Sequence, residues 1–154
     1  MSIRNGLAAS MHSGFEKLLS IFNAHGVKYL VVGGHAVMLY TEPRYTRDLD
    51  LWVEASNQNC ARTFYALAAF GAPLTGLGPE DFAHEGFFYQ IGVPPVRVDI
   101  LMSVSGLKFA EAWPNRNESA IGGQKVWFIS RADLIRNKRA YGRHIDLHDV
   151  ELLE

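Results

Sequence analysis

The feature that most constrains this chain is an apolar run ending in two glycines, followed at close spacing by a pair of acids. Val31 and Val32 lead into Gly33 and Gly34, and after thirteen intervening residues comes the segment Asp48-Leu49-Asp50-Leu51. Glycines let the backbone approach a phosphate closely, and carboxylates two residues apart on a strand point the same way. The pattern therefore predicts a site for a metal ion and a triphosphate.

Length and composition favour one domain without a strong charge field. The chain has 154 residues, 48% hydrophobic and 20% charged, so we expect a single domain over residues 1–154. Its formal net charge of -1 excludes a globally basic protein. Any nucleic-acid contact would need a local patch. The six Lys and Arg residues between Lys125 and Arg143 could supply one, because Asp133 is the lone acid among them.

The cysteine content and the N-terminal sequence favour a cytoplasmic protein. Cys60 is the only cysteine, which excludes an intrachain disulfide and a cysteine-based zinc cluster. The N-terminus lacks the basic segment and apolar core of a secretory signal. The longest mainly apolar run, residues 29–40, contains two glycines and a histidine, so we expect no membrane-spanning segment. The sequence leaves a homo-oligomer open.

The hydrophobic pattern predicts strands interspersed with helices. Apolar residues from Phe15 to Phe22 recur at helical spacing and predict a helix over about 14–25, with Ser13 as its N-cap. Further helices are expected at about 36–40, 57–70 and 107–112, from a cap at Ser130 or Asp133 to about 141, and at 146–153. Strands are expected at 28–32, 48–53, 86–91, 96–101 and 125–129, with a loop over 71–78 and a turn over 92–95. This order predicts an α+β fold in which a small mixed β-sheet is flanked by helices.

Three aspartates are candidate metal ligands. Asp48 and Asp50 share one face of a predicted strand, and Asp99 interrupts a later apolar strand. If these strands are neighbours the three acids converge, and crowded carboxylates repel one another unless cations are present. Mg²⁺ prefers such oxygens, and two ions about 3.5 to 4 Å apart would steady the attacking and leaving oxygens of a phosphoryl transfer. We therefore predict Mg²⁺ as the cofactor, with Asp99 also placed to accept a proton from an acceptor hydroxyl.

The start of the helix after the glycine pair is a candidate phosphate site. The amides at Gly34 and at the helix start can donate to the β- and γ-phosphates, where the helix dipole favours negative charge. Gly33 and Gly34 leave the approach open. Arg44 and Arg47 either clamp the triphosphate through bidentate hydrogen bonds or pair with the acids of the following strand when no metal is bound.

These motifs occur in an order that resembles the DNA polymerase β-like nucleotidyltransferase superfamily. The order is an apolar strand, Gly-Gly, a helix, Asp-x-Asp on the next strand and a lone Asp on a later one, and it covers residues 28–101. Gly-Gly-His-Ala followed by residues 44–51 resembles the minimal bacterial and archaeal members, including the toxin nucleotidyltransferases of abortive-infection systems. Many members have Ser at the position of Gly34, so one hydroxyl contact to phosphate is expected to be missing here.

The C-terminal part of the chain extends the resemblance. Lys138, Arg143, Asp146 and Asp149 are similar to a Lys-then-Arg-then-Asp-x-x-Asp motif of these proteins. The resemblance implies that Lys138 neutralises the α-phosphate or the leaving pyrophosphate, whereas its place on a helix equally suits a solvated face. Asp146 and Asp149 share a helix face, and pairing with Arg143 would give them a structural role.

The resemblance implies a magnesium-dependent nucleotidyltransferase that moves a nucleoside monophosphate from an NTP such as ATP to an acceptor hydroxyl and releases pyrophosphate. The expected catalytic residues are Asp48, Asp50, Asp99 and Lys138, and the expected substrate-binding residues are Gly33, Gly34, Arg44 and Arg47. An RNA 3′ end or a partner protein is the implied acceptor, with a small molecule such as an antibiotic as a further candidate. The rival interpretation is a non-catalytic nucleotide-binding or antitoxin-like interaction module.

Overall fold

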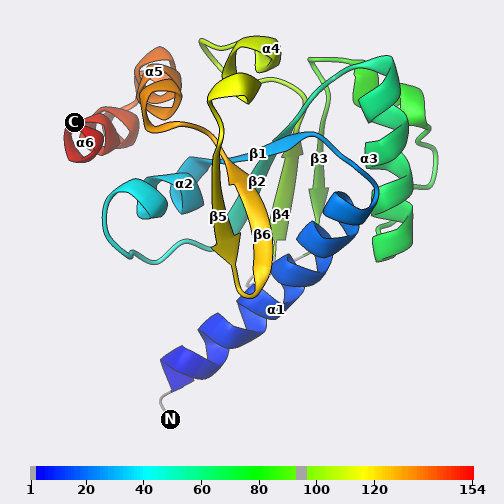
Figure 1. Cartoon of the computed structure of the whole chain (residues 1–154), viewed down its shortest axis with the longest axis horizontal. Helices are drawn as coiled ribbons and strands as arrows, with labels where there is room; N and C mark the ends of the chain where they lie inside the picture. The colour runs from blue at the N-terminus through cyan, green and yellow to red at the C-terminus, as the bar shows by residue number, and fades with distance from the viewer. Residues whose placement is uncertain (1–2, 93–96) are drawn as a thin grey trace.

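A computed structural model describes the backbone of residues 3–92 and 97–154, and within these ranges the side chains from residue 14 onward. One mixed sheet organises the chain (Figure 1). Its strands are β1 (Tyr29–Val32), β2 (Asp48–Val53), β3 (Phe88–Ile91), β4 (Arg97–Leu101), β5 (Asn117–Ile121) and β6 (Gln124–Phe128). The helices are α1 (Ile3–Ala24), α2 (Gly33–Tyr40), α3 (Asn57–Phe70), α4 (Phe109–Ala112), α5 (Arg131–Tyr141) and α6 (His144–Leu153), with 3-10 turns η1 (Pro79–Ala83) and η2 (Trp113–Asn115).

The strand order is β3-β4-β2-β1-β6-β5. The central strand β1 pairs antiparallel with β2 and parallel with β6, and β2 pairs parallel with β4. The outer strands β3 and β5 run antiparallel to β4 and β6. This confirms the expected mixed α+β sheet and places the strand that carries Asp99 beside the strand that carries Asp48 and Asp50.

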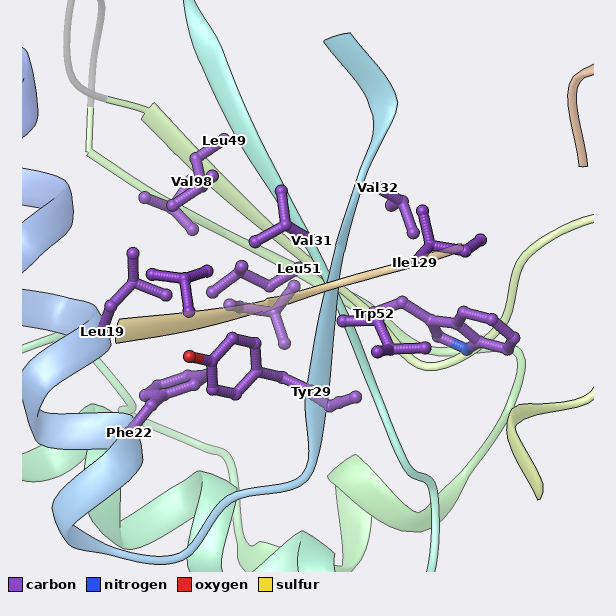
Figure 2. Packing of buried hydrophobic residues seen from close by; sticks show 14 of the residues in the cluster. Leu19, Phe22, Tyr29, Val31, Val32, Leu49, Leu51, Trp52, Val98 and Ile129 are labelled. Carbon is purple, nitrogen blue, oxygen red and sulfur yellow. The ribbon is translucent and has the colours of Figure 1, made fainter. Parts of the chain in front are cut away.

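The two faces of the sheet differ, and this difference positions the acids. Figure 2 shows Leu19 and Phe22 of α1 on the same side of the sheet as Leu49 and Leu51, while Trp52 lies on the other side. All five of these side chains are buried. Because side chains alternate along a strand, the packing of the two leucines against α1 directs the intervening acids of β2 to the opposite face. Hydrophobic burial on one face therefore fixes where the carboxylates point.

The buried side-chain amide of Asn59 connects helix α3 to the sheet through hydrogen bonds. Its side-chain oxygen accepts a hydrogen bond from the backbone N–H of Lys28 at 2.8 Å. Its Nδ2 donates to the carbonyls of Lys28 at 3.0 Å and Glu54 at 2.9 Å. Asn59 is fully buried, so these three bonds satisfy backbone groups at the ends of β1 and β2 that water does not reach.

The helix boundaries differ from expectation in identifiable places. Helix α1 begins at Ile3, so Ser13 lies inside the helix and the prediction of an N-cap there is wrong. Helix α2 begins at Gly33 rather than near residue 36. Ser130 is the cap of α5, because its hydroxyl accepts the backbone N–H of Asp133 at 3.1 Å. Across the described ranges, none of the helices combines the length and apolarity needed to cross a membrane.

Strand β5 was not expected from the sequence. Its residues, Asn117–Ile121, are mostly exposed and polar, as suits an edge strand, and they show no apolar alternation. The available signal is the turn: Ile121 pairs with Gln124 across Gly122 and Gly123, a two-residue hairpin connection. The turn expected over 92–95 lies, from residue 93 on, outside the described residues.

Replacing Asn59 by Ala should lower the free energy of unfolding by about 2 to 3 kcal/mol, because buried backbone donors and acceptors lose their partners. Urea unfolding monitored by circular dichroism measures the change. The control is Asn57→Ala, which alters an exposed residue of the same helix and should change stability by less than about 0.5 kcal/mol. Equal stabilities of the two variants would contradict the role assigned to the buried amide.

Candidate active site

The parallel pairing of β2 with β4 brings two carboxylates face to face. Asp50 is the register partner of Asp99, and Asp48 is the partner of Arg97. Neighbouring strands lie about 4.8 Å apart, so side chains in register on the same face are in contact range. The expectation that Asp99 lies beside the Asp-x-Asp pair is therefore confirmed.

The environment of Asp50 makes its ionisation unfavourable. Burial is the largest cause that raises the pKa of Asp50, from 3.8 to about 7, and the charge and hydrogen bonding of Asp99 and the charge of Asp48 raise it further. The positive charge of Lys138 acts in the opposite direction. A cation brought to these oxygens would favour the ionised form, so the site is chemically suited to receive one.

Gly33 is required by its own conformation and by Asp50. Its φ of +67° lies in the left-handed region, which side-chain-bearing residues rarely adopt. A Cβ at this position would overlap Oδ2 of Asp50 and approach its Cγ to 3.1 Å. The carboxylate thus packs directly against the glycine at the first position of α2, which explains why the two motifs occur together.

Gly34 is packed against Thr46. A Cβ at residue 34 would lie 2.7 Å from Cγ2 and 3.0 Å from Oγ1 of Thr46, closer than packed atoms allow. A serine at this position would therefore require Thr46 to shift. Thr46 was not among the residues predicted from the sequence. Its hydroxyl lies beside Gly34, the position at which many members of the resembled superfamily carry a serine hydroxyl.

Lys138 is buried, so a solvated helix face is wrong for it. Its Nζ lies 3.2 Å from Oδ2 of Asp149 and 3.5 Å from Oδ1 of Asp146. Asp149 also accepts a bidentate pair of hydrogen bonds from Arg44, at 2.6 and 3.2 Å. Burial by itself raises the pKa of Asp149, but the hydrogen bonds and charges of Arg44 and Lys138 outweigh burial and lower it.

Asp146 completes this network, in which the cations outnumber the acids. Arg143 donates to Asp146 from Nε at 2.6 Å and from Nη2 at 3.2 Å, so the predicted pairing is confirmed for Asp146. It is wrong for Asp149, whose partners are Arg44 and Lys138. Burial raises the pKa of Asp146, but the hydrogen bonds and charges of Arg143, with the charge of Lys138, lower it overall. We refer to Arg44, Lys138, Arg143, Asp146 and Asp149 as the α6 ion network. It leaves one excess positive charge.

The α6 ion network forms one wall of a cavity of about 400 Å³ whose opposite wall is the glycine pair and Asp50. Tyr141 and Ile145 also line the cavity and are 42% and 62% exposed, so its outer part is apolar and open. The cavity thus combines a helix N-terminus, an excess cation and a half-buried carboxylate. These are complementary to a polyphosphate and a divalent cation.

Three predicted site residues do not line this cavity: Asp48, Asp99 and Arg47. Arg47 is exposed and forms no ion pair with another residue of the described ranges. Neither Arg44 nor Arg47 pairs with the acids of β2, so that alternative is wrong for both. The reason is that Arg97, which sequence reasoning did not single out, holds the position beside Asp48.

The donor set fits a hard divalent cation, although its oxygens are not yet grouped around one point. Within residues 14–92 and 97–154, no three His, Cys, Asp or Glu side chains are arranged to hold a metal ion. Yet Oδ1 of Asp48 and Oδ1 of Asp99 are buried and find no hydrogen-bond partner in the part of the chain that the structure describes. Unpartnered carboxylate oxygens are the ligands that Mg²⁺ prefers.

The basic stretch between Lys125 and Arg143 is largely neutralised within the molecule. Lys125 pairs with Glu118, and Arg139 pairs with Glu154. Arg131 donates to the carbonyls of Leu153 and Tyr40, while Lys138 and Arg143 belong to the α6 ion network. Of the six cations, Arg136 alone has no such partner among the described residues. The stretch therefore presents less free positive charge than its sequence indicates.

Replacing Asp149 by Asn should lower the free energy of unfolding by roughly 3 kcal/mol, the lower end of the range for breaking a buried ion pair. Its side chain is 1% exposed and serves two cations, which would both lose their charged partner. Urea unfolding at neutral pH measures the loss. Glu154→Gln, at an exposed ion pair, should change stability by less than about 1 kcal/mol; similar losses in both variants would contradict the buried role of Asp149.

In buffer containing EDTA, the stability of the protein should fall as the pH rises from about 4.5 to 7.5. The pKa of Asp50 is about 7 in the folded chain and near 3.8 when unfolded, so the folded state binds more protons in this window. Asp50→Asn removes the titrating group and should flatten this decline. Urea unfolding at several pH values compares the slopes. Parallel slopes for the two proteins would contradict the raised pKa.

Comparison with known proteins places this site in a family. The sequence profile of the family described as "Nucleotidyltransferase of unknown function (DUF6036)" matches residues 11–153. No curated protein matches the chain.

Solved structures share the fold at low sequence identity. The antibiotic-resistance factor ANT(2'')-Ia is 15% identical, with a TM-score of 0.62 over 94% of this chain and 83% of its own. The lincosamide antibiotic adenylyltransferase LnuA, solved with lincomycin bound, is 17% identical, with a TM-score of 0.58 over 92% of this chain and 94% of its own. An antigenic nucleotidyltransferase-like protein from Paracoccidioides brasiliensis is 17% identical, with a TM-score of 0.54 over 96% and 74%. With its sequence matched almost from end to end and its fold shared with these structures, the chain belongs to the DUF6036 family of nucleotidyltransferases.

Proposed function

We propose that the protein transfers a nucleoside monophosphate from an NTP to an acceptor hydroxyl and releases pyrophosphate, with Mg²⁺ as the cofactor. The observation that carries this proposal is the register of Asp50 with Asp99 at a cavity that also contains the glycine start of α2 and Lys138. One side of the cavity suits a cation and the other suits an anion. An NTP with its metal ion offers both charges in one ligand.

The triphosphate is proposed to lie at the N-terminus of α2. No side chain caps this terminus, so the first backbone N–H groups of the helix can donate to phosphate oxygens. Arg44 and Lys138 supply positive charge from the facing wall. To bind phosphate, each of them must exchange part of its contact with Asp149 for contact with the ligand.

Asp48, Asp50 and Asp99 are proposed to hold the metal, up to two ions when the NTP is bound. The metal would stabilise negative charge on the attacking and leaving oxygens of the transferred phosphoryl group. Asp99 is 15% exposed at its side chain, and we assign it a second role as acceptor of the proton from the attacking hydroxyl. The metal would leave Asp50 ionised despite its burial.

The nucleoside is proposed to lie in the apolar outer part of the cavity. Tyr141 and Ile145 are exposed there and can cover the flat surface of a base. Trp52 follows the acids on β2, but its side chain is 1% exposed and packs edge-to-face against Phe109 at 5.1 Å between ring centroids, so we leave it out of the site.

The acceptor hydroxyl belongs to a small molecule, a protein or an RNA 3′ end. Two structural neighbours are named as an antibiotic-resistance factor and an antibiotic adenylyltransferase, which supports including small molecules among the substrates to test. The internal pairing of most of the basic stretch favours a small acceptor over a long RNA. Resemblance to toxin-type members stays a hypothesis, which a protein or RNA acceptor would support.

Incubation with each α-labelled NTP, Mg²⁺ and a cell lysate should transfer label to one class of acceptor. Asp50→Asn should reduce this transfer roughly a thousandfold or more, because a ligand of the metal and a charge at the reacting phosphate are both lost. The control is Glu111→Gln, which removes an exposed charge on α4 and should retain activity.

Two results would contradict the proposal. Equal transfer by Asp50→Asn and the unaltered chain would remove Asp50 from the reaction. Absence of label on any acceptor, together with NTP binding that calorimetry shows to be indifferent to Mg²⁺, would favour a non-catalytic nucleotide-binding or antitoxin-like module.

A further inference from the structure

Arg97 occupies the centre of the carboxylate cluster. It is the first residue of β4 and the register partner of Asp48, and Asp99 follows it on the same face of the strand. Its Nη2 lies 2.8 Å from Oδ2 of Asp48, and its Nε lies 3.6 Å from Oδ1 of Asp99. A single guanidinium thus bridges two of the three carboxylates that the proposed function assigns to the metal.

The contacts of Arg97 with Asp48 and Asp99 pair opposite charges but leave several polar atoms without hydrogen bonds. Nε of Arg97, Oδ1 of Asp48 and Oδ1 of Asp99 are all buried without a hydrogen-bond partner among the described residues. The 3.6 Å contact with Asp99 is therefore an ion pair that lacks a hydrogen bond. A guanidinium paired with a carboxylate frequently uses its fork of donors, as Arg44 does on Asp149 in the same molecule. Arg97 lacks that bidentate arrangement.

We propose that Arg97 is a built-in counter-cation that a divalent metal ion must displace from Asp48 and Asp99. The inference rests on the proposed function, because it concerns the same metal ligands. In the unloaded protein the guanidinium offsets the repulsion among the three acids. When a divalent cation binds, it replaces one positive charge with two at the same oxygens, and Arg97 withdraws.

The position of Arg97 permits this withdrawal. Its side chain is 33% exposed, and that of Asp48 is 28% exposed, so the ion pair lies at the margin of the core rather than inside it. A long side chain at the first residue of a strand can turn toward solvent without crossing the sheet. Asp50, which is more deeply placed beside Gly33, keeps its position through the exchange.

Competition from Arg97 lowers the affinity for a metal ion that arrives alone. A metal that arrives with a triphosphate has the additional contacts of the phosphates with α2 and the α6 ion network, and these offset the loss of the Arg97 ion pair. Metal and nucleotide therefore load together rather than independently. This coupling is a property of one residue on β4, and it can be removed by substitution.

The test is the binding of Mn²⁺, a spectroscopic substitute for Mg²⁺, followed by electron paramagnetic resonance without nucleotide. Arg97→Met keeps the length of the side chain and removes its charge, so the dissociation constant for Mn²⁺ should fall at least tenfold. Arg62→Met, which removes an exposed charge on α3, should leave it unchanged. Circular dichroism verifies that each variant is folded. Equal or weaker Mn²⁺ binding by folded Arg97→Met overturns the inference.

Thermal unfolding supplies a second readout that remains informative if Arg97→Met folds poorly. In EDTA the variant should melt at a lower temperature than the unaltered chain, and Mg²⁺ should raise its melting temperature by more. Arg97→Lys keeps one positive charge but cannot place two nitrogens on two carboxylates, so its Mn²⁺ affinity should lie between those of the other two proteins. An affinity of Arg97→Lys equal to that of the unaltered chain also overturns the inference.

The label-transfer assay separates this inference from the proposed function. Transfer of label by the unaltered chain together with unchanged Mn²⁺ affinity in Arg97→Met would overturn the role of Arg97 and leave the proposed function standing. Tighter Mn²⁺ binding by Arg97→Met together with no label transfer by the unaltered chain would support the counter-cation and overturn the proposed reaction.

Discussion

The parallel pairing of β2 with β4 is the constraint on which the site depends, because it places Asp50 against Asp99 at a half-buried position. Two carboxylates in register repel, and burial adds to the cost of their charge. Neighbouring residues accommodate the two carboxylates or offset their repulsion in different ways. Gly33 leaves room for the Asp50 carboxylate, Arg97 supplies a guanidinium beside Asp99, and Lys138 contributes positive charge from α5.

Two charge clusters of opposite sign therefore adjoin the cavity, which Asp50 lines from the acidic cluster while Asp48, Asp99 and Arg97 lie outside its lining. With all groups ionised, the acids of β2 and β4 outnumber Arg97 by three to one. In the α6 ion network three cations meet two acids. Opposite charges attract, so the first cluster suits a cation and the second suits a phosphate, and this polarity would orient the proposed metal–nucleotide complex. The buried ion pairs of the α6 ion network keep its charged side chains in position and so maintain this difference in charge.

Local sequence patterns were sufficient for features that depend on a few neighbouring residues. Alternation along β2 predicted the face of Asp48 and Asp50, and the glycine pair predicted a turn into a helix, although α2 begins at Gly33 itself rather than near residue 36. The convergence of the acids was predicted on the condition that their strands are neighbours, and β2 does pair with β4. Strand β5 was missed because an exposed edge strand needs no apolar alternation.

The contacts and residues that sequence patterns missed depend on partners that only the fold brings together. Both Asp149 and Arg44 were candidates, but their pairing spans 105 positions and no local pattern could indicate it. From the sequence alone, Arg97 resembles any exposed charge at the start of a strand. Only the register of β2 with β4 shows that Asp48 lies opposite it. Thr46 becomes relevant only because the backbone of Gly34 packs against its side chain. A residue type that the local backbone requires can therefore be predicted from the sequence. The partner of a charged side chain can be identified only once the fold is known.

Because Arg44, Lys138, Asp48 and Asp99 already have internal ion-pair partners, the proposed ligand binding is an exchange of ion pairs. In this proposal phosphate would gain contacts with Lys138 and Arg44 at the expense of Asp149, and a metal would gain Asp48 and Asp99 at the expense of Arg97. Each exchange alone would leave one protein charge unpaired in a partly buried site. Leaving a charge unpaired there costs more free energy than it would at an exposed ion pair. When both occur together, the opposite charges of the ligand compensate both losses. On the proposed function, the site would therefore favour a metal–polyphosphate complex over either component alone.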